Sequence, residues 1–280
     1  MRDNQKRMSA GAEPAPQASE PNAPALNFAT PTEFVELPTK GSFYPDDHPL
    51  CGQETIEIKY MTARDEDILT SPTLLKKGLA IDRFLQNVIV DKRINISSMI
   101  SGDKAAIMVA SRINGFGSDY VTKVACPDCG ETSENIFDLS AVEKNDILSF
   151  EDFDVLLTEN NTFKIKLPRT KVEVEVRLLT GKDEVELAQS MQQKKKKKAL
   201  ETNLTDQIKK IVVSVNGVDD LRTINQFIQS MPAFDSRYLR NIYSKIVPGL
   251  NMRQDFSCEN CGLNQEVDIP MTVDFFWSKQ

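Results

Sequence analysis

Four of the five cysteines lie in two short motifs of the kind that binds metal ions. The segments 126–130 and 258–262 read CPDCG and CENCG. A Cys-x-x-Cys turn brings two sulfur atoms within reach of one ion, and the following glycine lets backbone N–H groups approach the sulfurs. Because zinc prefers four tetrahedral ligands and one pair supplies only two, the two pairs together predict one Cys₄ zinc site. Its predicted ligands are Cys126, Cys129, Cys258 and Cys261.

The two pairs are far apart in the chain, with 128 residues between Cys129 and Cys258, unlike the pairs of a compact zinc finger. A site closed by four thiolates has no open position for a substrate, so we expect one structural zinc per chain. Metal binding at such a site contributes on the order of 10 kcal/mol, which rivals the whole stability of a domain. Loss of one ligand is therefore expected to loosen the two halves of the chain from each other.

Two other interpretations of these cysteines stay open at this point. Two separate redox disulfides would need a thioredoxin-like βαβ setting and a thiol of low pKa, and neither is evident in the sequence. In the second interpretation, the two pairs are remnants of metal sites that bind no ion, or their cysteines form disulfides between subunits. The fifth cysteine, Cys51, stands alone near Pro49 and Gly52 and is interpreted as a loop thiol.

The other chemically active residue types do not form a recognisable catalytic set. The single histidine, His48, lies in a loop rich in proline and aspartate. No phosphate-binding loop, Rossmann glycine pattern or Gly-x-Ser-x-Gly motif occurs. The best carboxylate candidates are the pairs 65–66 and 183–184, but both fall where a first helical turn is expected, and acidic residues are favoured there by the helix dipole. We therefore expect no enzyme.

The chain contains an internal repeat. Residues 56–69 (IEIKYMTARDEDIL) align without a gap with residues 174–187 (VEVRLLTGKDEVEL), at an offset of 118. Each copy continues to one of the cysteine pairs. A unit that ends each time in half of a zinc site predicts two similar halves joined by one metal ion.

Hydrophobic spacing predicts a mixture of strands and helices in each copy. In the first copy we expect a strand over 56–61, a helix start at Thr62 and Asp65, helical residues from 75 to 89, a helix over 103–113, and strands over 120–125 and 134–139. In the second copy we expect a hairpin of 162–167 with 170–179, a helix start at Thr180 and Asp183, helical spacing through Ile208, Ile211, Val212 and Val215, and a last helix ending at Pro248. The predicted fold class is α+β, with two repeated strand–helices–strand units and one zinc-ribbon-like site.

These elements suggest a division into four parts. Residues 1–30, rich in Ala, Pro, Glu, Asn and Gln, are expected to form a disordered arm, which either stays free or orders on a partner. Residues 31–139 are predicted as the first unit, 140–171 as connecting strands, and 172–280 as the second unit. A run of five lysines at 194–198 is interpreted as a solvated helix end or loop, with an acidic neighbour or DNA as the alternative partners.

Composition excludes several classes of protein. The 280 residues are 40% hydrophobic and 27% charged, which is ordinary for a globular protein. The net charge of −7 does not favour nucleic-acid binding by the whole surface. No apolar run approaches the roughly 18 residues that span a bilayer, and the N-terminus has no secretory signal. An intracellular, reducing setting is the default expectation, and there paired cysteines more often bind metal than form disulfides.

An ordered set of motifs resembles the baseplate hub and hub-assembly protein family of T-even-like contractile-tailed bacteriophages. The motifs are LPTKG at 37–41 with Tyr44 and Pro45, YMTARDEDIL at 60–69, Arg112 and Ile113 followed by Gly115, Gly117, Tyr120 and the first cysteine pair, DSRYLR at 235–240, and FFW at 275–277. The resemblance covers residues 34–278. The terminal aromatic residues are expected to fill a core or an interface.

The resemblance implies a virion protein of the tail baseplate, assembled in the host cytoplasm, without catalytic residues. Its partners would be other baseplate and tail proteins in a multimeric assembly. Three alternatives remain at this stage. The chain could act as an assembly catalyst or chaperone that is absent from the mature virion. It could instead be a zinc-ribbon nucleic-acid-binding protein that uses its lysines, with a redox enzyme as a third possibility.

Overall fold

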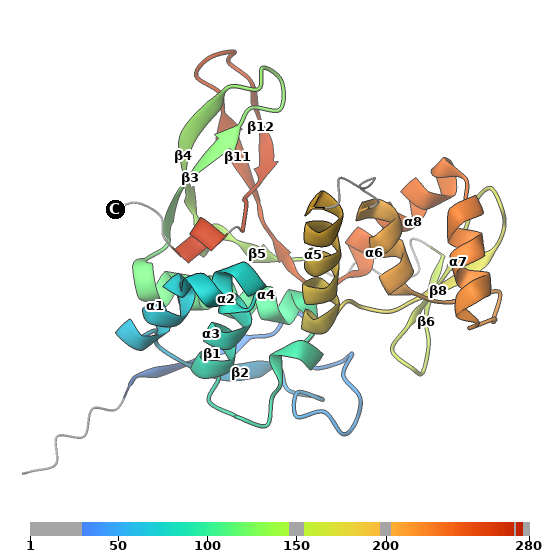
Figure 1. Cartoon of the computed structure of the whole chain (residues 1–280), viewed down its shortest axis with the longest axis horizontal. Coiled ribbons are helices and arrows are strands. Elements are labelled where there is room, and N and C mark those ends of the chain that lie inside the picture. Colours follow the sequence, from blue (N-terminus) through green and yellow to red (C-terminus); the bar gives the residue numbers. More distant parts are fainter. Residues whose placement is uncertain (1–29, 146–153, 197–202, 272, 277–280) are drawn as a thin grey trace, which may run out of the picture. The chain divides into compact units, whose positions relative to one another are not determined.

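The computed structural model describes residues 30–145, 154–196, 203–271 and 273–276, without the side chains of Lys195, Val273 and Asp274. The arm expected over residues 1–30 lies outside the described residues, except for Thr30. The chain from Pro31 onward is grouped by its contacts into one unit, separate from residues 1–30. Figure 1 shows its elements. The expected α+β class is confirmed, since helices and several small sheets alternate along the chain.

The first half contains a hairpin, four helices and a second hairpin. Its strands and helices are β1 (Thr32–Glu36), β2 (Thr55–Lys59), α1 (Ala63–Thr70), α2 (Pro72–Lys77), α3 (Ala80–Val88), α4 (Ser101–Phe116), β3 (Asp119–Ala125) and β4 (Thr132–Asp138). β1 pairs antiparallel with β2, and β3 with β4. The helical spacing of residues 75–89 is divided between two helices, because Gly78 adopts a positive φ of 68° that ends α2.

The second half adds a four-stranded antiparallel sheet. Its strands and helices are β5 (Glu143–Lys144), β6 (Val155–Leu157), β7 (Phe163–Lys166), β8 (Glu173–Val176), α5 (Gly181–Lys196), α6 (Asn203–Ile211), β9 (Val212–Val215), α7 (Leu221–Ser230), α8 (Ala233–Ile246), β10 (Leu250–Asn251), β11 (Arg253–Ser257) and β12 (Asn264–Asp268). The sheet order is β6-β7-β8-β9, and the expected hairpin around Pro168 is the β7–β8 pair. β5 pairs with β10, and β11 with β12.

The helical prediction for Val212 and Val215 was wrong. These residues lie in strand β9, which pairs antiparallel with β8. The segment VVSV is rich in β-branched valine, whose χ1 freedom is restricted in a helix and which packs well on a pleated sheet. The periodicity of Ile208 and Ile211 belongs to α6, which ends at Ile211.

The two halves share one hydrophobic core. Buried side chains of α3 and α4, such as Phe84 and Ile107, belong to the same cluster as Val174 of β8 and Ile242 of α8. Backbone bonds also cross between the halves: the Ser101 N–H donates to Leu179 O at 3.0 Å. The start of α4 is therefore fixed against the segment that leads into α5.

Two buried aspartates fix the helices that lead to the cysteine pairs. Asp103 in the first turn of α4 accepts from the backbone N–H of Thr39 at 3.0 Å and from its hydroxyl at 2.6 Å. Asp235 in the first turn of α8 accepts from the backbone N–H and hydroxyl of Thr170, at 2.9 and 2.8 Å. Each aspartate stands 23 positions before the first cysteine of its pair. A helix followed by a strand thus precedes each cysteine turn, and the two segments are similar.

A buried arginine ties α4 to the end of the chain. Arg112 is 1% exposed, and its guanidinium donates to the carbonyl oxygens of Phe275 at 2.9 Å, Gly117 at 2.7 Å and Asp119 at 3.1 Å. Phe275 and Phe276 are buried in the core, as expected for the terminal aromatics, while Trp277 lies outside the described residues. None of the helices in the described ranges is long and apolar enough to cross a membrane.

Candidate metal centre

The four predicted cysteines converge on one point. Their sulfur atoms all lie within 4.8 Å of one another. The Sγ atoms of Cys126 and Cys261 are 3.6 Å apart, and those of Cys129 and Cys258 are 3.8 Å apart. Four thiolates around zinc at Zn–S distances of about 2.3 Å would be separated by about 3.8 Å. The geometry therefore matches a tetrahedral site and not disulfides, and the cysteines are unbridged.

Each pair is held by the turn of a hairpin, β3–β4 or β11–β12. In the first turn the Gly130 N–H donates to Cys126 O at 2.9 Å, and in the second the Gly262 N–H donates to Cys258 O at 2.9 Å. These two glycines have φ angles of 74° and 73°, which a residue with a side chain rarely adopts. The two hairpins with their cysteine turns are called the ribbon below, and Figure 1 shows them side by side.

The base of the site is apolar and its outer side is open. Cys126 and Cys258 are buried together with Phe256, while Cys129 and Cys261 are exposed. The Asn260 side chain donates to the Cys129 sulfur from the other hairpin, at 3.6 Å. The sequence analysis did not single out Asn260, although a polar residue next to the last cysteine was a usable signal.

The thiols perturb one another strongly. A hydrogen bond from the backbone at Glu131, followed by one from Asn260, lowers the pKa of Cys129 to about 7. A backbone bond at Leu263 lowers the pKa of Cys261, but burial and the other three thiols raise it more, to about 12. Four sulfurs this close cannot all be charged without a cation between them, and a divalent ion would remove that conflict. The donor set thus fits a metal ion.

The hydrogen bonds of His48 prevent it from acting as a general base toward its neighbour Ser98. Its Nδ1 accepts from the Leu50 N–H at 3.2 Å, so the ring proton lies on Nε2, which is 2.9 Å from Ser98 Oγ. The Ser98 hydroxyl donates to Asn95 O at 2.8 Å. The histidine is therefore a donor to Ser98 and cannot take its proton.

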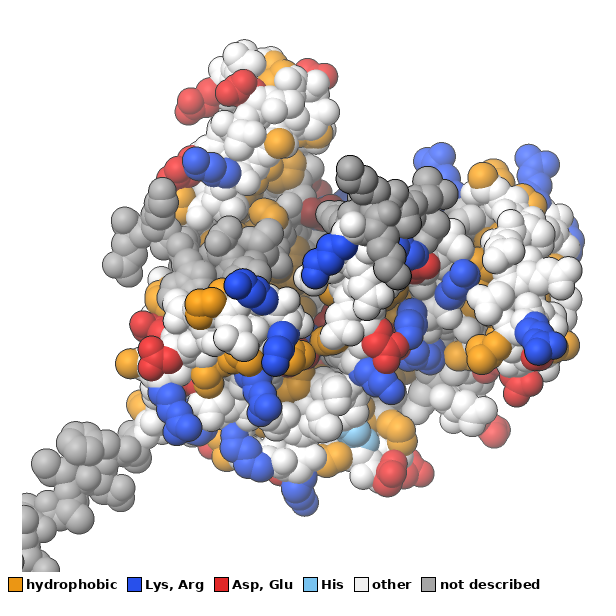
Figure 2. All heavy atoms as spheres, in the orientation of Figure 1, with side chains coloured by type: hydrophobic (Ala, Val, Ile, Leu, Met, Phe, Trp, Pro, Cys, Tyr) orange, Lys and Arg blue, Asp and Glu red, His pale blue; other side chains and the backbone are white. Residues whose placement is uncertain are grey.

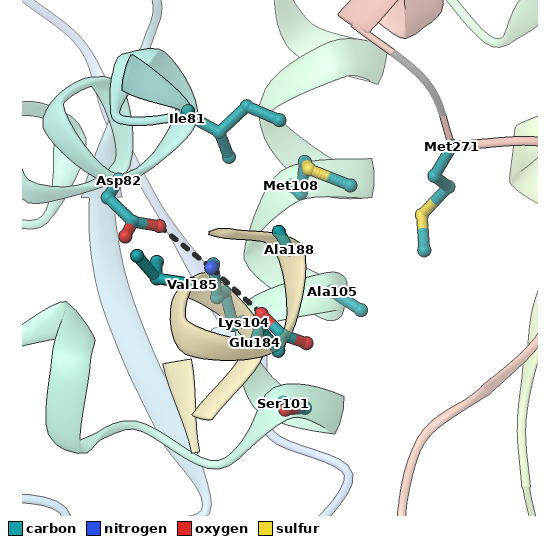
Figure 3. Close-up of a pocket in the computed structure, with 11 residues that line it drawn as sticks. Ile81, Asp82, Ser101, Lys104, Ala105, Met108, Glu184, Val185, Ala188 and Met271 are labelled. Atoms are coloured by element: carbon teal, nitrogen blue, oxygen red, sulfur yellow. Dashed lines mark hydrogen bonds and ion pairs between the residues drawn. The ribbon is translucent and has the colours of Figure 1, made fainter. Parts of the chain in front are cut away.

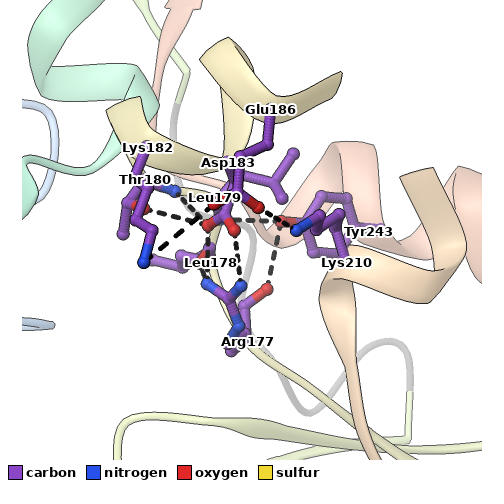
Figure 4. Close-up of polar contacts among 9 residues, drawn as sticks. All are labelled: Arg177, Leu178, Leu179, Thr180, Lys182, Asp183, Glu186, Lys210 and Tyr243. Carbon is purple, nitrogen blue, oxygen red and sulfur yellow. Dashed lines mark hydrogen bonds and ion pairs between the residues drawn. The ribbon is translucent and has the colours of Figure 1, made fainter. Parts of the chain in front are cut away.

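Two of the carboxylates suggested by the sequence, Asp65 and Asp183, form structural contacts at helix starts. Asp65 and Thr62 form the capping box of α1. At the start of α5, Asp183 accepts from the backbone and hydroxyl of Thr180, and from both terminal nitrogens of Arg177 at 2.8 Å (Figure 4). Burial raises the pKa of Asp183, but these donors lower it more, to about 2. A carboxylate held in this state is a poor proton donor at neutral pH.

A buried lysine that the sequence analysis missed joins three helices. Lys104 of α4 lies 2.7 Å from Asp82 of α3 and 2.9 Å from Glu184 of α5, at the wall of a pocket of about 270 Å³ (Figure 3). Burial lowers the pKa of Lys104, but the two carboxylates raise it more. The lysine therefore stays protonated and connects the two halves. In this state it cannot accept a proton as a general base would.

The lysine run is only partly described. Lys194 pairs with Asp206 of α6, and Lys196 is exposed at the end of α5, while residues 197 and 198 lie outside the described ranges. Cys51 is half-buried in its loop, where its thiol lies 4.0 Å from Asp46.

Comparison with protein families decides the identity. The family described as T4 bacteriophage base plate protein matches residues 32–277, which is most of the chain and contains both cysteine pairs. The chain belongs to the T4 bacteriophage base plate protein family. Comparisons with curated proteins and with solved structures gave no match. Membership in the T4 base plate family implies a location in the tail of a phage particle, with other tail proteins as partners.

Proposed function

We propose that this chain is a non-enzymatic structural protein of a contractile phage tail baseplate that binds neighbouring baseplate subunits. The observation that carries the proposal is the family match over residues 32–277. The roles of His48, Asp183 and Lys104 support it, because each of these groups is committed to an internal bond. Assembly would take place in the cytoplasm of the infected host, and the protein would remain in the virion.

We further propose that Cys126, Cys129, Cys258 and Cys261 hold one structural zinc ion. Support comes from the short distances between the four sulfur atoms and from the two matching glycine turns. Cys51, the fifth cysteine, is not part of this cluster. When bound, the ion would supply a closed tetrahedral centre that joins the hairpins of the two halves. The side-chain amide of Asn260 would orient the exposed thiolate of Cys129 and stabilise its charge by donating a hydrogen bond.

We also propose that the two halves are copies of one module, with units at 31–139 and 172–280. Three matched features support it. The first is the pair of capping interactions at Thr62 and Thr180, and the second is the pair of aspartates Asp103 and Asp235. The third is the pair of cysteine turns. In this interpretation the zinc ion joins the two copies at their cysteine turns.

Quantitative mass spectrometry of purified tails and of baseplate precursors tests the structural role. The proposal predicts the chain in both, at a constant ratio to other baseplate proteins. Presence in precursors with absence from finished tails would replace it with the role of an assembly catalyst or chaperone. Absence from both would remove any baseplate role for this chain.

Nucleic-acid binding by the ribbon is disfavoured by its charge. The two hairpins of the ribbon, residues 119–138 and 253–268, contain nine acidic residues and two basic residues, Lys123 and Arg253. Proteins bind nucleic acid chiefly by neutralising phosphates with lysine and arginine, and on this surface acidic residues far outnumber them.

A further inference from the structure

The ribbon has an acidic surface whose charges repel one another. Its two hairpins carry nine exposed carboxylates, those of Asp119, Asp128, Glu131, Glu134, Asp138, Asp255, Glu259, Glu266 and Asp268. Asp255 of β11 stands directly opposite Glu266 of β12 in the strand register. Like charges directly opposite on paired strands destabilise a hairpin. Among the described residues no ion pair involves either side chain. The cation on this face, Arg253, pairs with Asp268 and leaves Asp255 and Glu266 without an ion pair.

A groove between α2 and α5 has the opposite character. It has a volume of about 320 Å³, and we call it the α2–α5 groove. Its lining residues are Lys76, Lys77, Leu79, Gln189, Gln192, Gln193 and Lys196. The three lysines are exposed, and no acidic side chain of the described part of the chain lines the groove. Figure 2 shows Lys and Arg side chains gathered over this region and acidic side chains along the ribbon.

We propose that the α2–α5 groove binds the acidic face of the ribbon of a second copy of this chain. Binding would place lysines against Asp255 and Glu266 and would relieve the repulsion on both surfaces at once. The glutamines of the groove would add hydrogen-bond donors for the same carboxylates. A second copy of this chain would then be one specific partner, whereas the proposed baseplate function names no specific partner.

The two surfaces are different patches of the molecule, so the contact is head-to-tail. A head-to-tail contact leaves one free groove and one free ribbon after the first pairing, and it therefore builds a ring if the rotation closes and an open chain if it does not. Exposed charges dominate both surfaces, so the association should weaken with salt. A second copy is favoured over other acidic proteins because this chain itself supplies the complementary charge.

Sedimentation velocity on the purified full chain tests the proposal. We expect concentration-dependent association in about 50 mM NaCl that is largely lost in about 500 mM NaCl. The groove variant Lys76→Glu/Lys77→Glu and the ribbon variant Asp255→Lys/Glu266→Lys should each weaken it by at least about tenfold. Lys76→Gln/Lys77→Gln repeats the groove test without placing acids at the end of α2. Arg222→Glu/Arg237→Glu changes the charge equally on exposed residues outside the groove and should leave the association unchanged.

Mixing distinguishes this contact from other modes of association. An equimolar mixture of Lys76→Gln/Lys77→Gln and the ribbon variant retains one matched contact, between the intact groove of the ribbon variant and the intact ribbon of the glutamine variant, so we expect a 1:1 heterodimer. The chain that carries all four charge reversals should associate again. Metal content and thermal unfolding are measured on each variant, so that loss of the zinc site is recognised separately from loss of the contact. A monomeric wild type at low salt, or association that none of these variants weakens, would overturn the proposal.

Discussion

Asp183 links the stability of the fold to pH. Its pKa lies at about 2, below its ordinary value of 3.8, since Arg177 and Thr180 donate to the charged form. The unfolded chain therefore binds a proton at a higher pH than the folded chain does. The stabilisation is complete above about pH 5 and is lost as the pH falls toward 2.

We expect Asp183→Asn to lower the free energy of unfolding by about 1 to 2 kcal/mol at pH 7 and by less at pH 3. Urea unfolding at several pH values between 7 and 3 measures this difference. Asp219→Asn, at an exposed carboxylate before α7, is the control and should change little. A loss that is the same at both pH values would contradict the assignment.

Gly102 marks the closest approach between α4 and the segment after α8. A Cβ atom at this position would lie 2.0 Å from the backbone oxygen of Pro248, so the backbone would have to move. Gly102→Ala is expected to destabilise the protein by about 2 to 3 kcal/mol. Gly115→Ala, in the same helix, meets only the flexible end of Met61 and should cost less than about 1 kcal/mol. Equal melting temperatures for the two variants would show that the close contact is absent in solution.

At the scale of elements, local patterns predicted most of the strands and helices. The Thr-x-x-Asp helix starts, the strands beside each cysteine pair and the end of α8 before Pro248 all follow from short-range chemistry, and all were found. Strand β9 was missed, because four residues do not distinguish a helical from a strand period and the pairing partner β8 lies 36 residues earlier. Burial of Lys104 was also missed, since it depends on carboxylates brought by two other helices.

Arg112 joins three segments of the chain through hydrogen bonds. Its guanidinium is the donor to carbonyl oxygens at the end of α4, at the start of β3 and in the terminal segment. Arg112→Met keeps the volume but leaves these oxygens without that donor, so we expect a loss of about 3 kcal/mol in unfolding free energy. Arg83→Met, at an exposed arginine of α3, is the matched control and should stay within about 0.5 kcal/mol. A similar loss in both variants would exclude the role given to Arg112.

At the scale of the whole molecule, the shared core limits what each half can do alone. Because the buried clusters of both halves are continuous, a fragment of residues 31–139 would expose the faces of α3 and α4 that now contact the second half. We expect this fragment, and that of residues 172–280, to lack cooperative unfolding when expressed alone, as followed by circular dichroism. A sharp transition in either fragment would show that the halves are independent domains.

The central claim is that one metal ion joins both halves through four cysteines. The most direct test is metal analysis of the purified full chain beside Cys129→Ser, with Cys51→Ser as the matched control. The account predicts one zinc per chain in the wild type and in Cys51→Ser, and loss of most of it in Cys129→Ser. A wild-type chain that contains no zinc after purification without chelators, or a Cys129→Ser chain that keeps its full content, would contradict it.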